Sequence, residues 1–252
     1  MKDLVVIIYD AFGDWISANG MIRHLSHSYE KVYLVHDTPV VVSFTQNMFR
    51  DNTNIVPIQG LSVSHSNYDV IDLRIHECYS SPGGEVYFSK SNKYGTGSFF
   101  ANDNASAFYS ELGIDPEVRV REFNYERDLD KEEELYSSLN LPSKYSVVCK
   151  MNDGMIQKEY LKEDFVVNLH RLTDNFMHTL KVIENANDIH LIENSISLFV
   201  YHMQHIGKMK LVDINLHTYA RQESHRKCDS PDSDNLFLNM LKCPKLSNWN
   251  FV

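Results

Sequence analysis

The sequence has few cysteines and no cluster of basic residues, and each absence excludes a class of protein. Its four cysteines lie far apart and form no C-x-x-C pair, so neither a disulfide framework nor a zinc ribbon is indicated. Acidic side chains outnumber basic ones by 34 to 24, which gives a formal net charge of -10 with histidine neutral. Because this acidic surplus repels phosphate backbones, we expect no binding to nucleic acid.

Long hydrophobic runs are also missing from the sequence. The apolar run Leu4–Tyr9 is too short for the core of a signal peptide. No other run approaches the roughly 18–20 apolar residues that are needed to cross a bilayer. We therefore expect a soluble, cytoplasmic protein without a transmembrane segment. An apolar fraction of 43%, with 12% aromatic residues, is typical of a packed globular protein.

What is present is an alternation of short buried runs and helical stretches. The run Leu4–Tyr9 predicts a buried parallel strand, the spacing over Trp15–His27 predicts a helix, and Lys31–Val35 predicts another strand. The same pattern recurs along the first half of the chain, and a second series starts at Tyr145. Alternation of this kind favours parallel sheets that are flanked by helices, so we predict an α/β fold with two Rossmann-like domains.

The domain boundary is predicted around residues 126–144, where Glu126–Leu139 is a strongly charged helical stretch and Leu141-Pro142-Ser143-Lys144 is a breaker. We expect an N-terminal domain over residues 1–140 and a C-terminal domain over 141–225. The last strand of that second domain is predicted at Lys210–Ile214. Residues 226–252 are expected to form a tail that packs back on the body.

The first candidate site follows the opening strand, at Gly13 and Asp14. Ligands of open α/β sheets bind beyond the carboxyl ends of strands, and a glycine there lets the backbone approach a ligand. A carboxylate at this place suits a general base that deprotonates an acceptor hydroxyl. The alternative is that Asp14 caps the following helix. Asn19, farther along the same helix, is a candidate for lining the same cleft.

The second candidate site lies at a strand end and helix start, with Glu193, Asn194, Ser195 and Ser197. The free N–H groups and positive end of a helix suit a diphosphate, and these polar side chains add further partners. The alternative is an ordinary Asn or Ser N-cap. Lys150 follows the first strand of the second half and adds positive charge to the same cleft, unless it is simply solvated.

The third candidate is the segment after the predicted last strand. His217, Tyr219 and Arg221 alternate, so in an extended segment their side chains point the same way and line the interdomain cleft. The alternative is a packed tyrosine with two surface neighbours.

No metal site is expected, although the chain has 12 histidines. The pairs His24/His27 and His202/His205 have helical spacing, but neither has a third ligand nearby or an H-E-x-x-H pattern. The phosphate-binding patterns G-x-x-x-x-G-K-[ST] and G-x-G-x-x-G are missing, and so is the G-x-S-x-G nucleophile elbow.

Taken together, these motifs resemble a known family. The block Gly13–Leu25, in which a Gly-Asp pair follows the first strand, is similar to the opening of two-domain GT-B glycosyltransferases. The likeness is strongest to the bacterial heptosyltransferase-like group and to small GT-B-like proteins. Further similarities occur in the same order along the chain, at Tyr68–Asp72, Glu111–Ile114, Val182–Ser195, His217–Arg221 and Pro244–Trp249.

The resemblance implies two domains that face each other across a cleft. It also implies that a sugar passes from a nucleoside-diphosphate sugar to a hydroxyl of a glycan or lipid-linked acceptor. The Asp of the Gly-Asp pair is the proposed base, which falls on Asp14. The donor would be held mainly by the C-terminal domain, with Glu193, Asn194 and Ser195 facing its diphosphate or ribose. Such enzymes generally need no metal, so we expect no cofactor beyond the donor substrate, and direct displacement would invert the sugar.

Some features depart from the family. The chain is shorter than typical members and lacks their long basic and glycine-rich donor segments. It has Glu193-Asn194-Ser195 where many relatives carry Asp-Ser-Ser. These departures favour an alternative function, that of a non-catalytic protein with a GT-B-like fold that binds nucleotide sugars or glycans.

Overall fold

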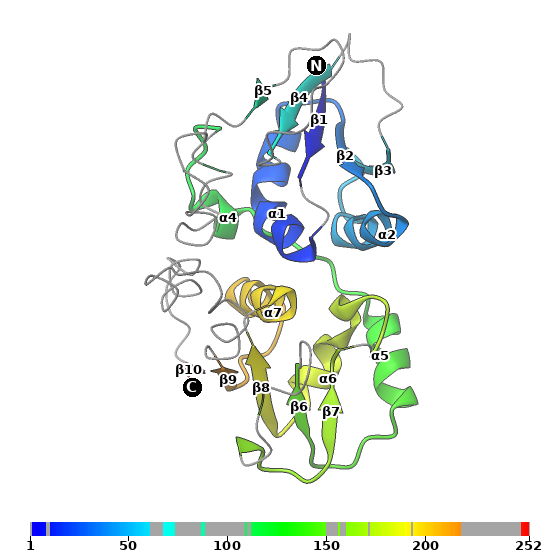
Figure 1. The fold of residues 1–252 in the computed structure, drawn as a ribbon, viewed down its shortest axis with the longest axis vertical. Helices are drawn as coiled ribbons and strands as arrows, with labels where there is room; N and C mark the ends of the chain where they lie inside the picture. The colour runs from blue at the N-terminus through cyan, green and yellow to red at the C-terminus, as the bar shows by residue number, and fades with distance from the viewer. Residues whose placement is uncertain are drawn as a thin grey trace, which may run out of the picture. The chain divides into compact units, whose positions relative to one another are not determined.

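The computed structural model describes residues 2–8, 11–60, 68–73, 87–88, 109, 112–149, 156, 160–170, 172–192, 194–217 and 248–251. The chain divides into two compact units, Met1–Glu126 and Arg127–Val252. Each unit is built on a parallel sheet with helices (Figure 1). The predicted α/β fold with two parallel sheets is therefore confirmed.

The first unit contains a sheet with the strand order β3-β2-β1-β4-β5, in which every neighbouring pair is parallel. The chain runs outward from β1 to β3 and then returns to the other side of β1 to form β4. The strands are β1 (Asp3–Ile7), β2 (Val32–His36), β3 (Ile55–Gln59), β4 (Tyr68–Asp72) and β5 (Tyr87–Phe88), and the helices that bear on the site are α1 (Phe12–Ser26), α2 (Pro39–Met48) and α4 (Val118–Arg121).

The central strand β1 is buried on both faces, which explains its continuous apolar sequence. Leu4, Val5 and Val6 are fully buried between β2 and β4. Helix α1 packs closely on α4, because Gly20 has no side chain at the contact. A Cβ atom at this position would lie 2.4 Å from the carbonyl oxygen of Val118.

The second unit has the strand order β10-β9-β8-β6-β7, again with all neighbours parallel. Here the chain passes from β6 to β7 and then crosses to the other side of β6 to form β8. The elements are α5 (Leu129–Ser138), β6 (Ser146–Val148), β7 (Val166–Asn168), the 3-10 helix η4 (Phe176–Thr179), α6 (Leu180–Glu184), β8 (Asp188–Ile192), α7 (Ser195–His205), β9 (Ile214–His217) and β10 (Trp249–Phe251).

The prediction of a last strand at Lys210–Ile214 is wrong. The strand β9 begins only at Ile214, because the side chain of Gln204 on α7 engages the segment before it. Its Nε2 atom donates to the carbonyl oxygens of Lys210, at 3.1 Å, and Val212, at 3.2 Å. The sequence analysis did not anticipate β10, which pairs with β9 and carries a buried Trp249 whose Nε1 atom donates to Gln204 Oε1 at 2.7 Å.

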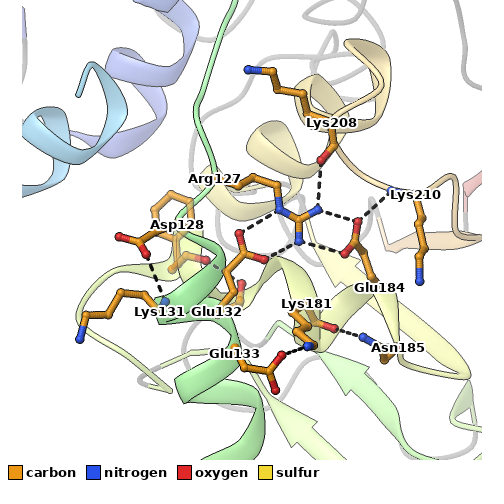
Figure 2. A network of polar contacts seen from close by, with 12 residues as sticks. Arg127, Asp128, Lys131, Glu132, Glu133, Lys181, Glu184, Asn185, Lys208 and Lys210 are labelled. Atoms are coloured by element: carbon orange, nitrogen blue, oxygen red, sulfur yellow. Dashed lines mark hydrogen bonds and ion pairs between the residues drawn. The ribbon is translucent and has the colours of Figure 1, made fainter. Parts of the chain in front are cut away.

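Arg127 opens the second unit and joins two of its helices (Figure 2). Its guanidinium donates to both carboxylate oxygens of Glu184 on α6, at 2.8 and 2.9 Å, and to both oxygens of Glu132 on α5, where the Nε contact is 2.9 Å. It also donates to the carbonyl oxygen of Lys208 at 3.0 Å. This network binds α5 to the second unit, and the two units divide between Glu126 and Arg127, at the start of the region 126–144 in which the boundary is predicted.

None of the helices in the described parts of the chain combines the length and the apolar character needed to cross a membrane.

Candidate functional site

Each sheet has one place where the strand order reverses, and such places are where open α/β sheets bind ligands beyond the carboxyl ends of the strands. In the first sheet the reversal lies between β1 and β4, and in the second sheet between β6 and β8. The first two candidate sites of the sequence analysis follow β1, β6 and β8. Each unit therefore has one candidate edge, at the carboxyl ends of its described strands.

Asp14 lies just beyond β1, in the first turn of α1. The N-cap of this helix is Ala11, and no side chain supplies a capping hydrogen bond there. Asp14 is therefore not the capping residue, and its backbone N–H donates to the Ala11 carbonyl oxygen at 3.1 Å. Its neighbour Gly13 belongs to the same turn, and both residues are partly buried.

Burial raises the pKa of the Asp14 carboxyl to about 6. A helix start favours a negative charge, so the loss of water around the carboxylate outweighs the helix dipole. A carboxyl group that exchanges its proton near neutral pH has the acidity that a general base needs.

Asn19 is fully buried inside the first unit and holds a neighbouring segment in place. Its Nδ2 atom donates to the carbonyl oxygen of Asn124 at 3.1 Å, and its Oδ1 atom accepts from the Asn124 N–H at 3.1 Å. The same oxygen accepts from Arg23 Nε at 3.0 Å, and Arg23 pairs in turn with Asp51. These contacts give Asn19 a structural role, and its lining of a ligand cleft stays a prediction.

In the second unit, Asn194 caps α7, as the alternative interpretation of this motif predicts. Its Oδ1 atom accepts from the N–H groups of Ile196 and Ser197, at 2.9 and 3.0 Å. The Ser197 hydroxyl, which is fully buried, accepts from the Asn194 N–H at 3.0 Å and donates to its carbonyl at 2.9 Å. The two residues form a reciprocal capping box, while Ser195 is the partly buried first residue of the helix.

Asn194 also links the two strand ends at which the second sheet reverses. Its Nδ2 atom lies 2.9 Å from the sulfur atom of Cys149, which directly follows β6. Burial raises the pKa of the Cys149 thiol to about 11, so the sulfur stays protonated and accepts this hydrogen bond. The contact fixes the geometry of this edge of the sheet.

Four of the predicted site residues, Lys150, Glu193, Tyr219 and Arg221, lie outside the described residues. Their assignment to donor binding or to a cleft stays a prediction.

His217 is the last residue of β9, not part of a segment beyond the last strand, and it is fully buried. Its Nε2 atom lies 2.7 Å from Nδ1 of His190 on the adjacent strand β8. Burial lowers the pKa of His217 to about 4, an effect that His190 reinforces and Asp188 opposes. His217 is therefore neutral near pH 7.

Three buried polar residues of the two sheets were not singled out from the sequence. Asp72 ends β4 beside Ile7, at the reversal of the first sheet, and is largely buried. Asp188 and His190 are spaced two apart on β8, which places both side chains on one face of the sheet. The sequence signal that could have identified Asp188 and His190 was the presence of polar residues at alternate positions of an otherwise apolar strand.

The described part of the chain contains no group of three or more His, Cys, Asp or Glu side chains that is arranged to hold a metal ion.

The fold is that of a two-unit α/β protein with an open parallel sheet in each unit. No family model and no curated protein matches the chain. Among solved structures, it is similar to the crystal structure of the glycosyl transferase family 9 from Veillonella parvula DSM 2008. The two share 11% sequence identity, 96% of each chain is covered, and the TM-score is 0.46.

Proposed function

We propose that the chain is a GT-B-type glycosyltransferase that moves a sugar from a nucleoside-diphosphate sugar to a hydroxyl acceptor. The first unit would bind the acceptor, a glycan or lipid-linked sugar, and the second would bind the donor. The observation that carries the proposal is the carboxyl group of Asp14, which stands at the strand reversal of the first sheet with its pKa raised to about 6. The resemblance of the Gly13–Leu25 block to heptosyltransferase-like enzymes supports it.

In this mechanism, Asp14 accepts the proton of the acceptor hydroxyl as that oxygen attacks the anomeric carbon. The bond from this carbon to the diphosphate breaks on the opposite side, so the configuration inverts. The start of α7 would stabilise the charge that develops on the leaving diphosphate, and no metal ion would be required. Lys150 and Glu193 would contact the donor from the ends of the neighbouring strands.

A second candidate function is non-catalytic binding of a nucleotide sugar or glycan. The capping box favours this second function, because the side chains of Asn194 and Ser197 already form hydrogen bonds with backbone groups at the start of α7. These groups are then less able to bind a diphosphate.

The test begins with a thermal-shift screen of UDP-, GDP-, ADP- and CMP-linked sugars without added metal. A ligand that binds the folded state raises the midpoint and thereby identifies the nucleotide. Transfer is then measured with that donor in the wild type, in Asp14→Asn and in the matched variant Asp37→Asn. Asp37 is exposed and follows β2 at the same edge of the first sheet.

We expect Asp14→Asn to lower kcat by roughly 10²–10⁴-fold while nucleotide affinity stays the same, since general-base catalysis contributes about this much. Asp37→Asn should behave as wild type. In the wild type, kcat/KM should rise with pH through about 6 as Asp14 ionises. Unchanged transfer in Asp14→Asn would refute its role as base, and nucleotide binding without turnover in the wild type would support the second candidate function.

A further inference from the structure

The hydroxyl group of Tyr109 contacts the backbone of helix α1 at two points. Its Oη atom donates to the Ser17 carbonyl oxygen at 2.9 Å and accepts from the Met21 N–H at 3.0 Å. These two backbone groups are four residues apart, so they are the partners of one ordinary hydrogen bond of an α-helix. A backbone N–H has only one hydrogen, and that of Met21 is directed to the tyrosine. Tyr109 therefore bridges the two partners of this bond.

Tyr109 is held firmly in this position. Its side chain is fully buried, and its carbonyl oxygen accepts from the N–H groups of Leu112, at 3.2 Å, and Ile114, at 2.8 Å. This turn contains Gly113, whose φ of 67° suits a glycine, and it leads to α4, which packs on α1 at Gly20. A buried hydroxyl has no water with which to replace its protein partners, so both contacts with α1 are needed to satisfy it.

The parts of α1 on the two sides of this bridge are attached to different elements. In the leading part, Phe12–Ser17, the fully buried ring of Trp15 packs edge-on against the ring of His36 at the end of β2, with centroids 4.4 Å apart. Behind the bridge, Arg23 donates to both carboxylate oxygens of Asp51, at 2.8 and 2.9 Å. A side chain that inserts between the partners of a backbone bond is a recognised cause of helix bending, so the two parts can each follow their own contacts.

Asp14 belongs to the leading part of α1, three residues before Ser17. This part has weak hydrogen bonding of its own, because no side chain caps it and the bond from the Trp15 N–H to the Ala11 carbonyl oxygen is long, at 3.4 Å. Burial is what raises the pKa of the Asp14 carboxyl, so this pKa depends on how closely the leading part packs.

We propose that Tyr109 is a positioning residue for Asp14. Its hydroxyl takes the place of the backbone bond between Ser17 and Met21, so that the leading part of α1 follows the edge of the first sheet and keeps Asp14 partly buried. Tyr109 acts through the helix and does not touch the substrate. The proposal rests on the function proposed above, in which Asp14 is the general base.

The variant Tyr109→Phe tests the proposal, because it removes only the hydroxyl. The Met21 N–H then returns to the Ser17 carbonyl oxygen, and the leading part is drawn into line with the rest of α1. Water reaches Asp14 more easily, so its pKa falls toward the usual value of 3.8. The midpoint is measured by nuclear magnetic resonance of the full chain with ¹³C-labelled aspartate carboxyl groups, and the Asp14 signal is assigned by its loss in Asp14→Asn. We expect a midpoint of about 6 in the wild type and one lower by about one pH unit or more in Tyr109→Phe.

Two control variants separate positioning from a general loss of stability. Asn52→Ala removes a hydrogen bond of 3.2 Å to the Ser26 hydroxyl, at the other end of α1. Tyr145→Phe removes a buried tyrosine hydroxyl that donates to a carbonyl oxygen of α6 at 2.7 Å. Neither shares a partner with Tyr109, so both should leave the Asp14 midpoint within about 0.2 pH units of the wild type. An unchanged midpoint in Tyr109→Phe, or an equal fall in Asn52→Ala, would overturn the proposal.

A measurement on the wild type serves if Tyr109→Phe does not fold. Scalar coupling across a hydrogen bond between the Met21 ¹⁵N and the Ser17 carbonyl ¹³C nuclei should be absent, because the N–H is directed to Tyr109. Coupling as strong as that between other residue pairs of α1 would contradict the proposal.

Activity distinguishes a failure of this proposal from a failure of the proposed function. A wild type that transfers no sugar would refute the function, whereas the Asp14 midpoint tests Tyr109 in either case. In the active protein, Tyr109→Phe should lower kcat by roughly 10–100-fold, since a misplacement of about 1 Å can cost this much. KM for the donor should stay nearly the same, and the rise of kcat/KM with pH should move to lower pH together with the Asp14 midpoint. Wild-type kcat and an unchanged pH profile would argue against a positioning role.

Discussion

Replacing Arg127 with methionine tests whether its buried ion pairs hold the second unit together. The side chains of Arg127, Glu132 and Glu184 are 15%, 1% and 9% exposed. Methionine supplies apolar volume but leaves two buried carboxylates near each other without a cation. Removing one partner of a buried ion pair costs about 3–5 kcal/mol, which is a large part of the roughly 5–15 kcal/mol that stabilises a domain. We expect the free energy of unfolding of this unit to fall by about 3–5 kcal/mol.

The matched control is Lys181→Met. Lys181 also connects α6 to α5, through Glu133, but these two side chains are 31% and 56% exposed. Exposed pairs contribute little because water and salt screen them. The urea midpoint of Lys181→Met should therefore stay close to that of the wild type.

The assay is urea unfolding of the full chain combined with hydrogen exchange of the peptides that contain β6 and β8, which reports on the second unit alone. Without the guanidinium, burial should raise the pKa of both Glu132 and Glu184 above their values in the unfolded chain. The folded variant then binds more protons than the unfolded chain, so its stability falls as pH rises.

The deficit of Arg127→Met relative to wild type should consequently narrow as pH is lowered from about 7 to about 5. A loss no larger than that of Lys181→Met would refute the reasoning. A deficit that stays constant with pH would refute it as well.

Three further predictions concern the two candidate edges and the helix packing. Gly20→Ala should destabilise the first unit by about 1–3 kcal/mol, because the new Cβ would meet the Val118 carbonyl at 2.4 Å, and a higher melting temperature would contradict this packing. Asn194→Ala should cost about 1 kcal/mol in urea unfolding and Asn194→Ser much less, whereas equal losses would argue against the cap. The pKa of Asp14 is raised by burial to about 6, so its carboxylate costs stability above that pH and little near pH 4. Asp14→Asn should therefore stabilise the protein by up to about 3 kcal/mol at about pH 8 and by less at about pH 4, and equal gains at both would contradict the shift.

The sequence predicted the central strands well because parallel strands are buried on both faces. The run Leu4–Tyr9 overlaps β1, and the run Lys31–Val35 overlaps β2. The end of the second sheet was harder to predict, since it depends on contacts between distant residues. The side chain of Gln204 forms hydrogen bonds with the segment before β9, and Trp249, which is distant in the sequence, pairs with β9.

The candidate site was predictable only in part, for similar reasons. A strand followed by Gly13 and Asp14 placed the carboxylate at a sheet edge, but the degree of its burial, and hence its pKa, depends on the packed structure. The motif at Asn194 allowed either a cap or a phosphate site, and the structure shows the cap. The partner of His217 could not be predicted, because His190 reaches it only through the pairing of β8 with β9.

The two strand orders also bear on how this chain arose. In the first unit, the second and third strands lie on the same side of the first strand. In the second unit, the third strand, β8, lies on the opposite side of β6 from the second, β7. Tandem duplication of a gene segment copies its strand order unchanged. The described strands of the two sheets therefore do not have the arrangement that an unchanged tandem copy of one half would give.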